Sequence, residues 1–297
     1  MKKNTHGNEC LNFPDNFLLY LGTSGGRFSM IKQLRSTGGI WFRYAGLNLL
    51  IDPGPGSLVR MCESILPTQN DEHAIVEDID GIILTHRHID HTGDVNVIIE
   101  GLTHGGRNKR GFLVTPPDCI WSDDQVVLHY EQKNLEKIIT ANDGEMLYLP
   151  NGISVFPVKH IHNGVEPLGY IFRCDGYPSV GFISDTKYLP ELGTIYKGLD
   201  VLSINCTFAM PRATSEHLSY PESVKLIEVA QPKLALLTHL CVHFFWDEYK
   251  NLSNTTKIGE TKLVMASDGM VVDINSRKFW RDYARSKTSK IISEEIN

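Results

Sequence analysis

The chain has 297 residues, of which 41% are hydrophobic and 22% charged, which is an ordinary balance for one large globular domain or two small ones. No stretch approaches the roughly 18 uncharged apolar residues of a membrane span, and no apolar core of a signal peptide follows the charged first residues, so we expect a cytoplasmic protein. The six cysteines form no C-x-x-C pair, so we expect neither a zinc ribbon nor a disulfide framework. The net charge of −6 argues against a broad nucleic-acid-binding surface, which needs clustered Lys and Arg.

Short apolar runs bounded by Gly or Pro follow a polar start, residues 1–16, that we expect to be a flexible segment. Runs of this length favour strands over helices. We expect strands at residues 17–21, 39–44, 47–51, 81–84, 112–114, 146–149, 153–158, 169–173, 180–183, 201–204, 234–237 and 262–266.

Two intervals between these runs favour helices. Residues 125–139 have a helix-forming composition, and Ser219 with Glu222 forms a capping box that opens a helix ending before Pro232. Early strands followed by strand–helix–strand units predict an α/β fold of two mixed sheets with helices outside. We expect residues 17–285 to form a single domain, and we assign no role to the polar tail, residues 286–297.

A dense group of ligand-type residues follows the expected strand at 81–84. Residues 85–91 read Thr-His-Arg-His-Ile-Asp-His, which places His86, His88, Asp90 and His91 within six positions. In an extended or looped segment, residues two apart share a side, so His86 and His88 can hold one metal while Asp90 and His91 turn toward another. Imidazole and carboxylate are natural ligands of a catalytic zinc ion with open positions.

The pattern Thr-His-x-His-x-Asp-His resembles the signature of the metallo-β-lactamase superfamily. Leu21-Gly22-Thr23 with Ser36-Thr37-Gly38-Gly39 resembles the N-terminal strand and loop of phosphodiesterase-like members, and Ile51-Asp52-Pro53-Gly54 resembles the family's structural aspartate turn. The resemblance covers residues 17 to about 270. It implies an αβ/βα sandwich with the metals at one edge of the two sheets.

The resemblance also implies three later ligands. The first is His160, three residues after Pro157, although His162 stands seven residues before Gly169-Tyr170 and is the alternative. The bridging carboxylate is Asp185, and the closing histidine is His239. The implied division is His86, His88, His160 and Asp185 on one metal, with Asp90, His91, Asp185 and His239 on the other.

The implied reaction is hydrolysis by a hydroxide held between two zinc ions, with manganese or iron as other metals. The second position of the cluster is His88, where the di-iron branch would carry Glu, which favours zinc. Asp90 is expected to act in catalysis as well as in metal binding. His217, in Ser-Glu-His-Leu-Ser before the capped helix, resembles the proton-donating histidine of the RNase Z branch, but it could equally only flank the helix.

The expected substrate is a small anionic phosphodiester, such as a cyclic nucleotide or a short oligonucleotide. The long basic, Gly-rich insertion with which RNase Z clamps tRNA is missing between the cluster and His160. Alternative hypotheses are an RNase Z-like endonuclease, a thioesterase or lactonase of glyoxalase-II type, and a metal-dependent scaffold or sensor. A homodimer is also expected, since members of this branch often dimerise.

Overall fold

The computed structural model describes residues 14–64, 76–245 and 255–280. Most of the expected N-terminal segment and all of the polar tail therefore lie outside the described residues, and the expected boundaries of the domain stay predictions. Residue Asn16 is described and is buried, and its side-chain oxygen accepts the N–H of Ala45. Within the described residues, no helix is long and apolar enough to cross a membrane.

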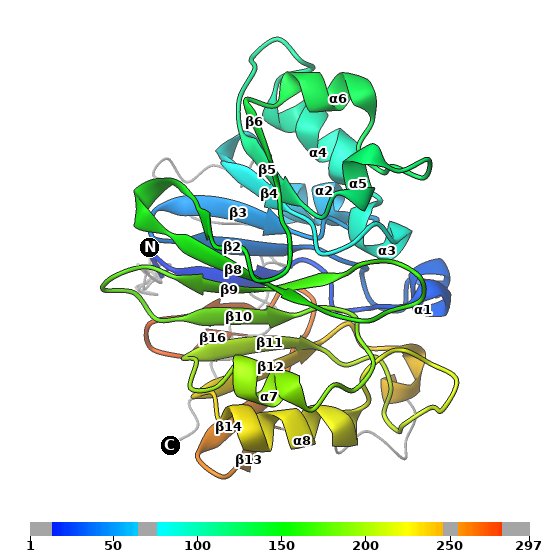
Figure 1. Cartoon of the computed structure of the whole chain (residues 1–297), viewed down its shortest axis with the longest axis vertical. Coiled ribbons are helices and arrows are strands. Elements are labelled where there is room, and N and C mark those ends of the chain that lie inside the picture. Colours follow the sequence, from blue (N-terminus) through cyan, green and yellow to red (C-terminus); the bar gives the residue numbers. More distant parts are fainter. Residues whose placement is uncertain (1–13, 65–75, 246–254, 281–297) are drawn as a thin grey trace, which may run out of the picture.

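Two mixed eight-stranded sheets form the centre of the molecule, as the sequence predicted (Figure 1). The first sheet has the strand order β16-β15-β1-β2-β3-β4-β5-β6. Its strands are β1 (Phe17–Tyr20), β2 (Ile40–Tyr44), β3 (Leu47–Ile51), β4 (Gly81–Ile83), β5 (Phe112–Thr115), β6 (Lys137–Thr140), β15 (Val271–Asp273) and β16 (Phe279–Trp280). Strands β3 to β6 run parallel to one another.

The second sheet has the order β13-β14-β12-β11-β10-β9-β8-β7. Its strands are β7 (Leu147–Tyr148), β8 (Ser154–Lys159), β9 (Leu168–Arg173), β10 (Val180–Ile183), β11 (Val201–Asn205), β12 (Leu234–Thr238), β13 (Thr256–Ile258) and β14 (Thr261–Met265). Strands β10, β11, β12 and β14 are parallel. The carboxyl ends of parallel strands meet at one edge of a sheet, and ligand sites in such sheets lie there.

Helices cover the outer faces of both sheets or lie at the ends of their strands. They are α1 (Arg27–Lys32), α2 (Ser57–Glu63), α3 (Ile89–Thr92), α4 (Val95–Leu102), α5 (Asp118–Trp121), α6 (His129–Asn134), α7 (Glu191–Ile195) and α8 (Tyr220–Ala230), with short 3₁₀ turns at Val76–Asp78, Pro150–Gly152 and Val242–Phe245. In Figure 1, α4, α5 and α6 lie beyond the first sheet, and α7 and α8 lie beyond the second.

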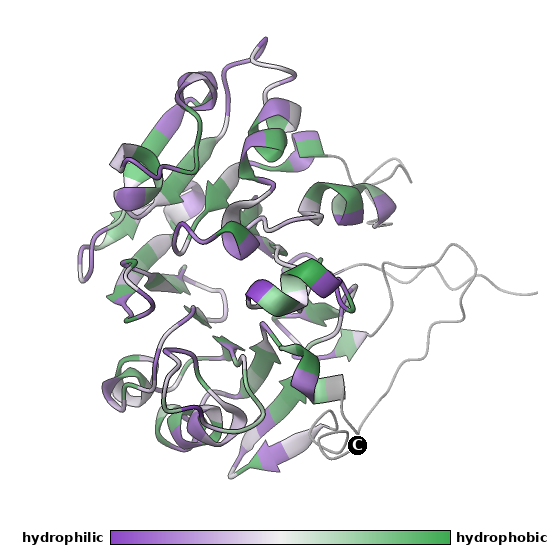
Figure 2. Cartoon of the chain, turned by 90° about the vertical axis from the view of Figure 1, so that its right-hand side faces the viewer, coloured by the Kyte–Doolittle hydropathy of each residue, from purple (hydrophilic) through white to green (hydrophobic). Residues whose placement is uncertain are grey.

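Three apolar layers hold this arrangement together. Successive strand residues point to opposite faces, so Leu18 and Tyr20 of β1 enter the layer between the sheets, where Phe172 and Phe182 meet them, while Leu19 faces the helices. A third layer lies between the second sheet and α7 and α8. In Figure 2 the strands are coloured mainly as hydrophobic, whereas the helices mix hydrophobic and hydrophilic residues.

The expected helix at residues 125–139 is wrong over most of its length. Only His129–Asn134 is helical, and Lys137–Thr140 is strand β6, which pairs in parallel with β5. The backbone hydrogen bonds along the edge of the sheet override a weak helix preference. The capping box is confirmed, because the Glu222 carboxylate accepts the N–H of Ser219 at 2.9 Å.

Candidate metal centre

The segment after β4 carries the four ligand-type residues on which the sequence analysis focused. His86 and His88 lie in a loop, and Asp90 and His91 lie in the short helix α3 that follows it. His86, Asp90 and His91 are buried, and His88 is half-buried. Nε2 of His86 lies 3.1 Å from Nδ1 of His88. The Asp90 carboxylate accepts the N–H of Gly26 at 2.9 Å, so the loop before α1 helps to fix it. One short segment, a loop followed by α3, thus presents several metal-binding atoms.

Asp52 supports this loop from the end of β3. Its carboxylate accepts the backbone N–H of Thr85 at 2.8 Å and the Thr85 hydroxyl at 2.7 Å, and it lies 2.8 Å from Nδ1 of His91. A carboxylate on the outer nitrogen of a metal-binding histidine fixes its tautomer and raises its basicity. Ser184, after β10, donates its hydroxyl to that of Thr85 at 2.8 Å, which connects this support to the second sheet.

The second sheet brings three strand ends to the same place. His162 follows β8, Asp185 follows β10 and His239 follows β12. Oδ2 of Asp185 is 3.3 Å from Nε2 of His239 and 3.4 Å from Nε2 of His91. The same oxygen is 3.4 Å from Nδ1 of His217 and 3.6 Å from Nε2 of His162. Asp185 therefore lies next to four histidines, which come from both sheets.

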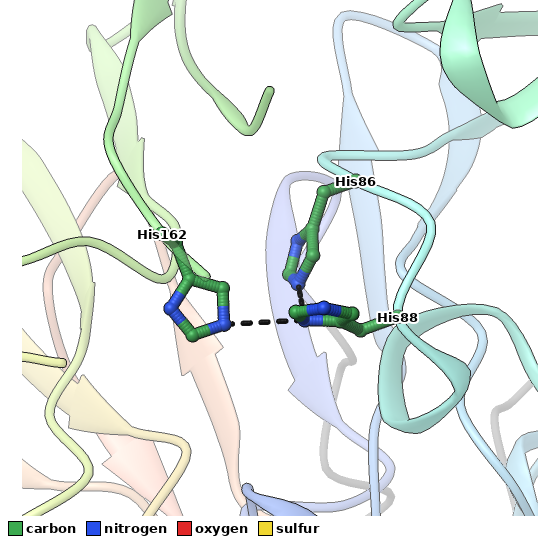
Figure 3. Close-up of side chains that lie close together, drawn as sticks. All are labelled: His86, His88 and His162. Carbon is green, nitrogen blue, oxygen red and sulfur yellow. Dashed lines mark hydrogen bonds between the residues drawn. The ribbon is translucent and has the colours of Figure 1, made fainter. Parts of the chain in front are cut away.

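Histidines from the two sheets also meet directly. Nε2 of His162 lies 3.1 Å from Nδ1 of His88, and Figure 3 shows the rings of His86, His88 and His162 pointing toward one another. On the other side of Asp185, Nε2 of His91 lies 3.1 Å from Nε2 of His239. Two facing lone pairs repel, so each such contact needs a proton or a cation between the nitrogens.

His160, which the sequence favoured over His162, lies elsewhere. Both of its ring nitrogens are buried and lack a hydrogen-bond partner among the described residues, and its ring centre is 6.4 Å from that of Tyr196. A Cβ atom added to Gly169 of β9 would lie 2.5 Å from Cε1 of His160, so the His160 ring packs tightly against β9. The N–H of His160 still donates to the carbonyl of Pro167 at 2.9 Å, in line with the β8–β9 pairing, whereas His162 begins the turn in which its carbonyl accepts the N–H of Val165 at 3.0 Å. The geometry thus favours the alternative, His162.

On the second-sheet side, neutral groups contact ring nitrogens of the histidines. The Thr207 hydroxyl lies 2.9 Å from Nδ1 of His239 and 3.1 Å from Nδ1 of His217. Nδ1 of His162 lies 2.8 Å from the backbone carbonyl of Glu216, and the Asn205 amide donates to Asp185 at 2.8 Å. The sequence analysis missed these supports. Asn205 ends β11 and Thr207 follows it, at the same sheet edge as Asp185, and that position was a signal.

Charge at the centre favours a bound cation. Burial, with His91 next, lowers the pKa of His86 well below its ordinary value, and burial with His162 lowers the pKa of His88 to about 4. Burial would also lower the pKa of His91, but neighbouring carboxylates, Asp185 first, raise it well above its ordinary value. The lowered pKa values keep His86 and His88 neutral, and the raised pKa of His91 shows that the nearby carboxylates favour positive charge. A divalent metal needs both, neutral imidazole ligands and a site that favours a cation.

Four groups of residues have donor atoms that all lie within 4.8 Å of one another. They are His86, His88 and His162; His86, His91 and Asp185; Asp90, His91 and His239; and His162, Asp185 and His217. Two of the four groups share Asp185, one with His86 and His91 and the other with His162 and His217, which fits two neighbouring cations joined by one carboxylate. Hard carboxylate oxygens and borderline imidazole nitrogens suit zinc, and they also suit manganese or iron.

A cleft of about 690 Å³ opens beside this centre. Asp90, Asp185 and His217 line its inner part, and α1 with residues 207–215 and 241–243 lines its outer part. The volume lies within the range of about 300–1,000 Å³ that small-molecule sites occupy. A substrate in this cleft would lie directly against the candidate metal-binding atoms.

A family model described as "Beta-lactamase superfamily domain" matches residues 47–240. The chain belongs to this superfamily. Its members are hydrolases, and the two eight-stranded sheets with outer helices are the metallo-β-lactamase fold. The match includes the loop after β4, Asp185 and His239, so family membership and the geometry of the candidate centre concern the same part of the chain.

Two curated relatives extend the comparison. An uncharacterized protein of Methanocaldococcus jannaschii is 28% identical over 232 residues, which cover 76% of this chain and 83% of the relative. The ribonuclease Z of Methanopyrus kandleri is 32% identical over 173 residues, which cover 57% of this chain and 53% of that enzyme.

Solved structures share the fold at low sequence identity. The metallo-β-lactamase fold protein YhfI of Bacillus subtilis has a TM-score of 0.69 at 20% identity, covering 87% of this chain and 99% of that one. A diphosphatase of the PhnP family has a TM-score of 0.64 at 20% identity, covering 86% and 96%. The short form of human tRNase Z has a TM-score of 0.64 at 16% identity, covering 87% and 99%.

Proposed function

We propose that the chain is a dinuclear-zinc phosphodiesterase that acts on small phosphodiesters. One zinc ion would be held by His86, His88, His162 and Asp185. The other would be held by Asp90, His91, Asp185 and His239. The convergence of histidines from both sheets on Oδ2 of Asp185, at 3.3 to 3.6 Å, carries this proposal.

Two ions bound in this way lower the pKa of water toward neutrality and stabilise negative charge in the transition state. The chain's own residues position the reaction. Asp52 and Thr207 hold the outer nitrogens of His91 and His239, so the inner nitrogens keep their direction. Asp90, fixed by the Gly26 N–H, keeps a carboxylate oxygen 3.4 Å from Nε2 of His239 at the base of the cleft.

We place His217 beside the leaving group. It lines the cleft, and its Nδ1 is held between the Thr207 hydroxyl and Asp185. Burial lowers the pKa of His217 to about 4. The negative charge of a phosphodiester bound nearby would raise that pKa and favour the protonated ring that can donate to a departing alkoxide.

The similarity to a ribonuclease Z and to the fold of a diphosphatase supports phosphorus over carbonyl carbon as the reacting centre. A cleft of about 690 Å³ supports a small substrate. The homodimer and the cytoplasmic location expected from the sequence stay predictions, and gel filtration of the purified protein checks the first.

The test is hydrolysis of bis(p-nitrophenyl) phosphate by metal-replete protein, with metal content measured on the same samples. Asp185→Ala should abolish turnover and reduce metal content. Asp175→Ala changes an exposed carboxylate in the turn after β9, at the opposite end of the strand from His162, and should keep both. About two zinc ions per active chain are expected for a dinuclear site.

Full metal occupancy without hydrolysis of any phosphodiester would reject this proposal. Turnover of thioesters or lactones by the same protein would then favour the glyoxalase-II type of reaction. Tight metal binding without turnover of any ester would favour the scaffold or sensor hypothesis.

A further inference from the structure

A continuous wall of side chains runs outward from the candidate metal centre. The ring centre of His217 lies 5.6 Å from that of His239 and 5.7 Å from that of Phe208. The guanidinium carbon of Arg212 lies 4.4 Å from the Phe208 ring centre. Of these four residues, Phe208, Arg212 and His217 line the cleft. Arg212 therefore stands a few contacts away from the reacting centre, on the same surface.

The Arg212 guanidinium is held in place before any ligand binds. It lies over the face of Phe208, and its Nη2 donates to a ring nitrogen of His243 at 2.9 Å. Among the described residues, the hydrogen bonds of the guanidinium involve Nη2 alone, which leaves the N–H groups of the other two nitrogens for another acceptor. A planar fork of donors, fixed by stacking, matches a phosphate group with little further loss of side-chain freedom.

The opposite wall of the cleft is cationic and aromatic. Arg27, Phe28 and Lys32 of α1 line it, and 75% of the Phe28 side chain is exposed. Among the described residues that line the cleft, the only carboxylates are Asp90 and Asp185, both of the candidate metal centre. The outer cleft of a chain with a net charge of −6 is thus locally positive. An exposed aromatic ring in such a groove is a stacking surface for a nucleobase.

We propose that Arg212, held by Phe208 and His243, binds a second phosphate group of the substrate, one nucleotide away from the phosphodiester that is cleaved. The substrate class is then a short linear oligonucleotide with a terminal phosphate, rather than a cyclic mononucleotide. This inference rests on the proposed phosphodiesterase function, and it adds the substrate class and the residue that selects it.

The experiment compares the dinucleotide pApA, which has a 5′-phosphate, with ApA, which lacks it. Both kcat/KM and the dissociation constant, by calorimetry, are measured for the wild type, Arg212→Met, Arg212→Lys and Arg173→Met. Arg173 is exposed at the far end of β9 and is the matched control for loss of one surface cation. Bis(p-nitrophenyl) phosphate serves as a substrate without a second phosphate.

The wild type should prefer pApA over ApA by about tenfold or more, since a hydrogen bond to a charged group contributes roughly that factor. Arg212→Met should remove the preference, mainly through KM, Arg212→Lys should retain part of it, and Arg173→Met should leave it unchanged. Equal values for pApA and ApA in the wild type, or a preference that survives Arg212→Met, would overturn the inference.

The two proposals fail in different ways. If bis(p-nitrophenyl) phosphate is hydrolysed but pApA is not preferred, only the role of Arg212 is rejected. If no phosphodiester is hydrolysed, the phosphodiesterase function is rejected, and the calorimetric ratio of pApA to ApA still decides whether Arg212 binds a phosphate.

Discussion

The two sheets contribute to the candidate centre in different ways. The first sheet supplies one continuous segment, residues 86–91, and supports His91 with the carboxylate of Asp52. The second supplies three separate strand ends and supports His239 with the neutral hydroxyl of Thr207. The ligands of the first sheet are thus close together in the sequence, and a charged side chain supports them. The ligands of the second sheet come together only when β8, β10 and β12 take their places in the sheet, and neutral hydrogen bonds support them.

The strongest test of this division is the carboxylate that both halves share. Asp185→Asn should lose both metal ions and reduce turnover by more than about a hundredfold, beyond the usual effect of an outer partner. His239→Ala, on one side of Asp185, should lose mainly one ion. Metal content by mass spectrometry, with activity on bis(p-nitrophenyl) phosphate, measures both variants. Retention of two ions by Asp185→Asn would contradict a bridging role.

The next largest expected effect is the loss of metal when His162, but not His160, is replaced. His162→Ala should release metal, because its Nε2 lies 3.1 Å from Nδ1 of His88 and 3.6 Å from Asp185. His160→Leu, which replaces a buried ring without hydrogen-bond partners among the described residues, should keep metal and most activity. Both variants are compared by zinc content and by thermal unfolding. Loss of zinc from the folded His160→Leu protein would restore the original sequence prediction.

The two kinds of support can be compared directly. Asp52→Asn should weaken metal binding by about 10- to 100-fold, since it removes the charge from the outer partner of His91. Thr207→Val should have a smaller effect, because a neutral hydroxyl contributes less than a carboxylate. Competition with a chelator gives both affinities. An equal or larger effect of Thr207→Val would mean that charge does not distinguish the two halves.

The smallest expected effect lies in the second sheet away from the centre. The carboxylate of Asp200 accepts a hydrogen bond from Nζ of Lys233 at 2.7 Å and another from the backbone N–H of Ser179 at 2.8 Å. Burial would raise the pKa of Asp200, but these donors, Lys233 first, lower it below the ordinary value. A lowered folded pKa gives stability that is present above the unfolded pKa of about 3.9 and is lost as pH falls through the folded value.

Asp200→Asn should therefore destabilise the protein at pH 7 by less than about 1 kcal/mol, because the pair is partly exposed and screened by salt. The difference from the wild type should shrink as the pH falls below about 4. Urea unfolding at several pH values measures it, with Asp175→Asn as the exposed control. A difference that is constant with pH would show that the effect does not come from the charge of Asp200.

Much of the fold could be predicted because its strands are short apolar runs that Gly and Pro interrupt. Prediction failed where tertiary pairing decides the local structure. Residues 137–140 have a helix-forming context, yet they form the edge strand β6 because β5 offers it a parallel partner. Helix α3 contains Asp90 and His91, and α4 follows it closely; neither helix was predicted.

The residues of the candidate site also divide into those that the sequence could predict and those that it could not. Residues His86, His88, Asp90 and His91 stand together in the sequence, so their proximity needs no knowledge of topology. His160 and His162 could not be separated, because residues two apart share a side in an extended chain. In the fold, His160 still pairs with Pro167 whereas His162 begins a turn, and this difference is not visible in the sequence. Arg212 carries no sequence signal, since its role depends on contacts with Phe208 and His243.

The position of Asp185 between histidines of both sheets also bears on how the protein survives in a cell. Each proposed ion would take ligands from both sheets and would clamp the sandwich at its open edge. Ions that bind the folded chain alone increase its stability with the logarithm of their concentration. Metal scarcity would then lower activity and resistance to proteolysis together, so the amount of this protein would follow the zinc supply without any dedicated sensor.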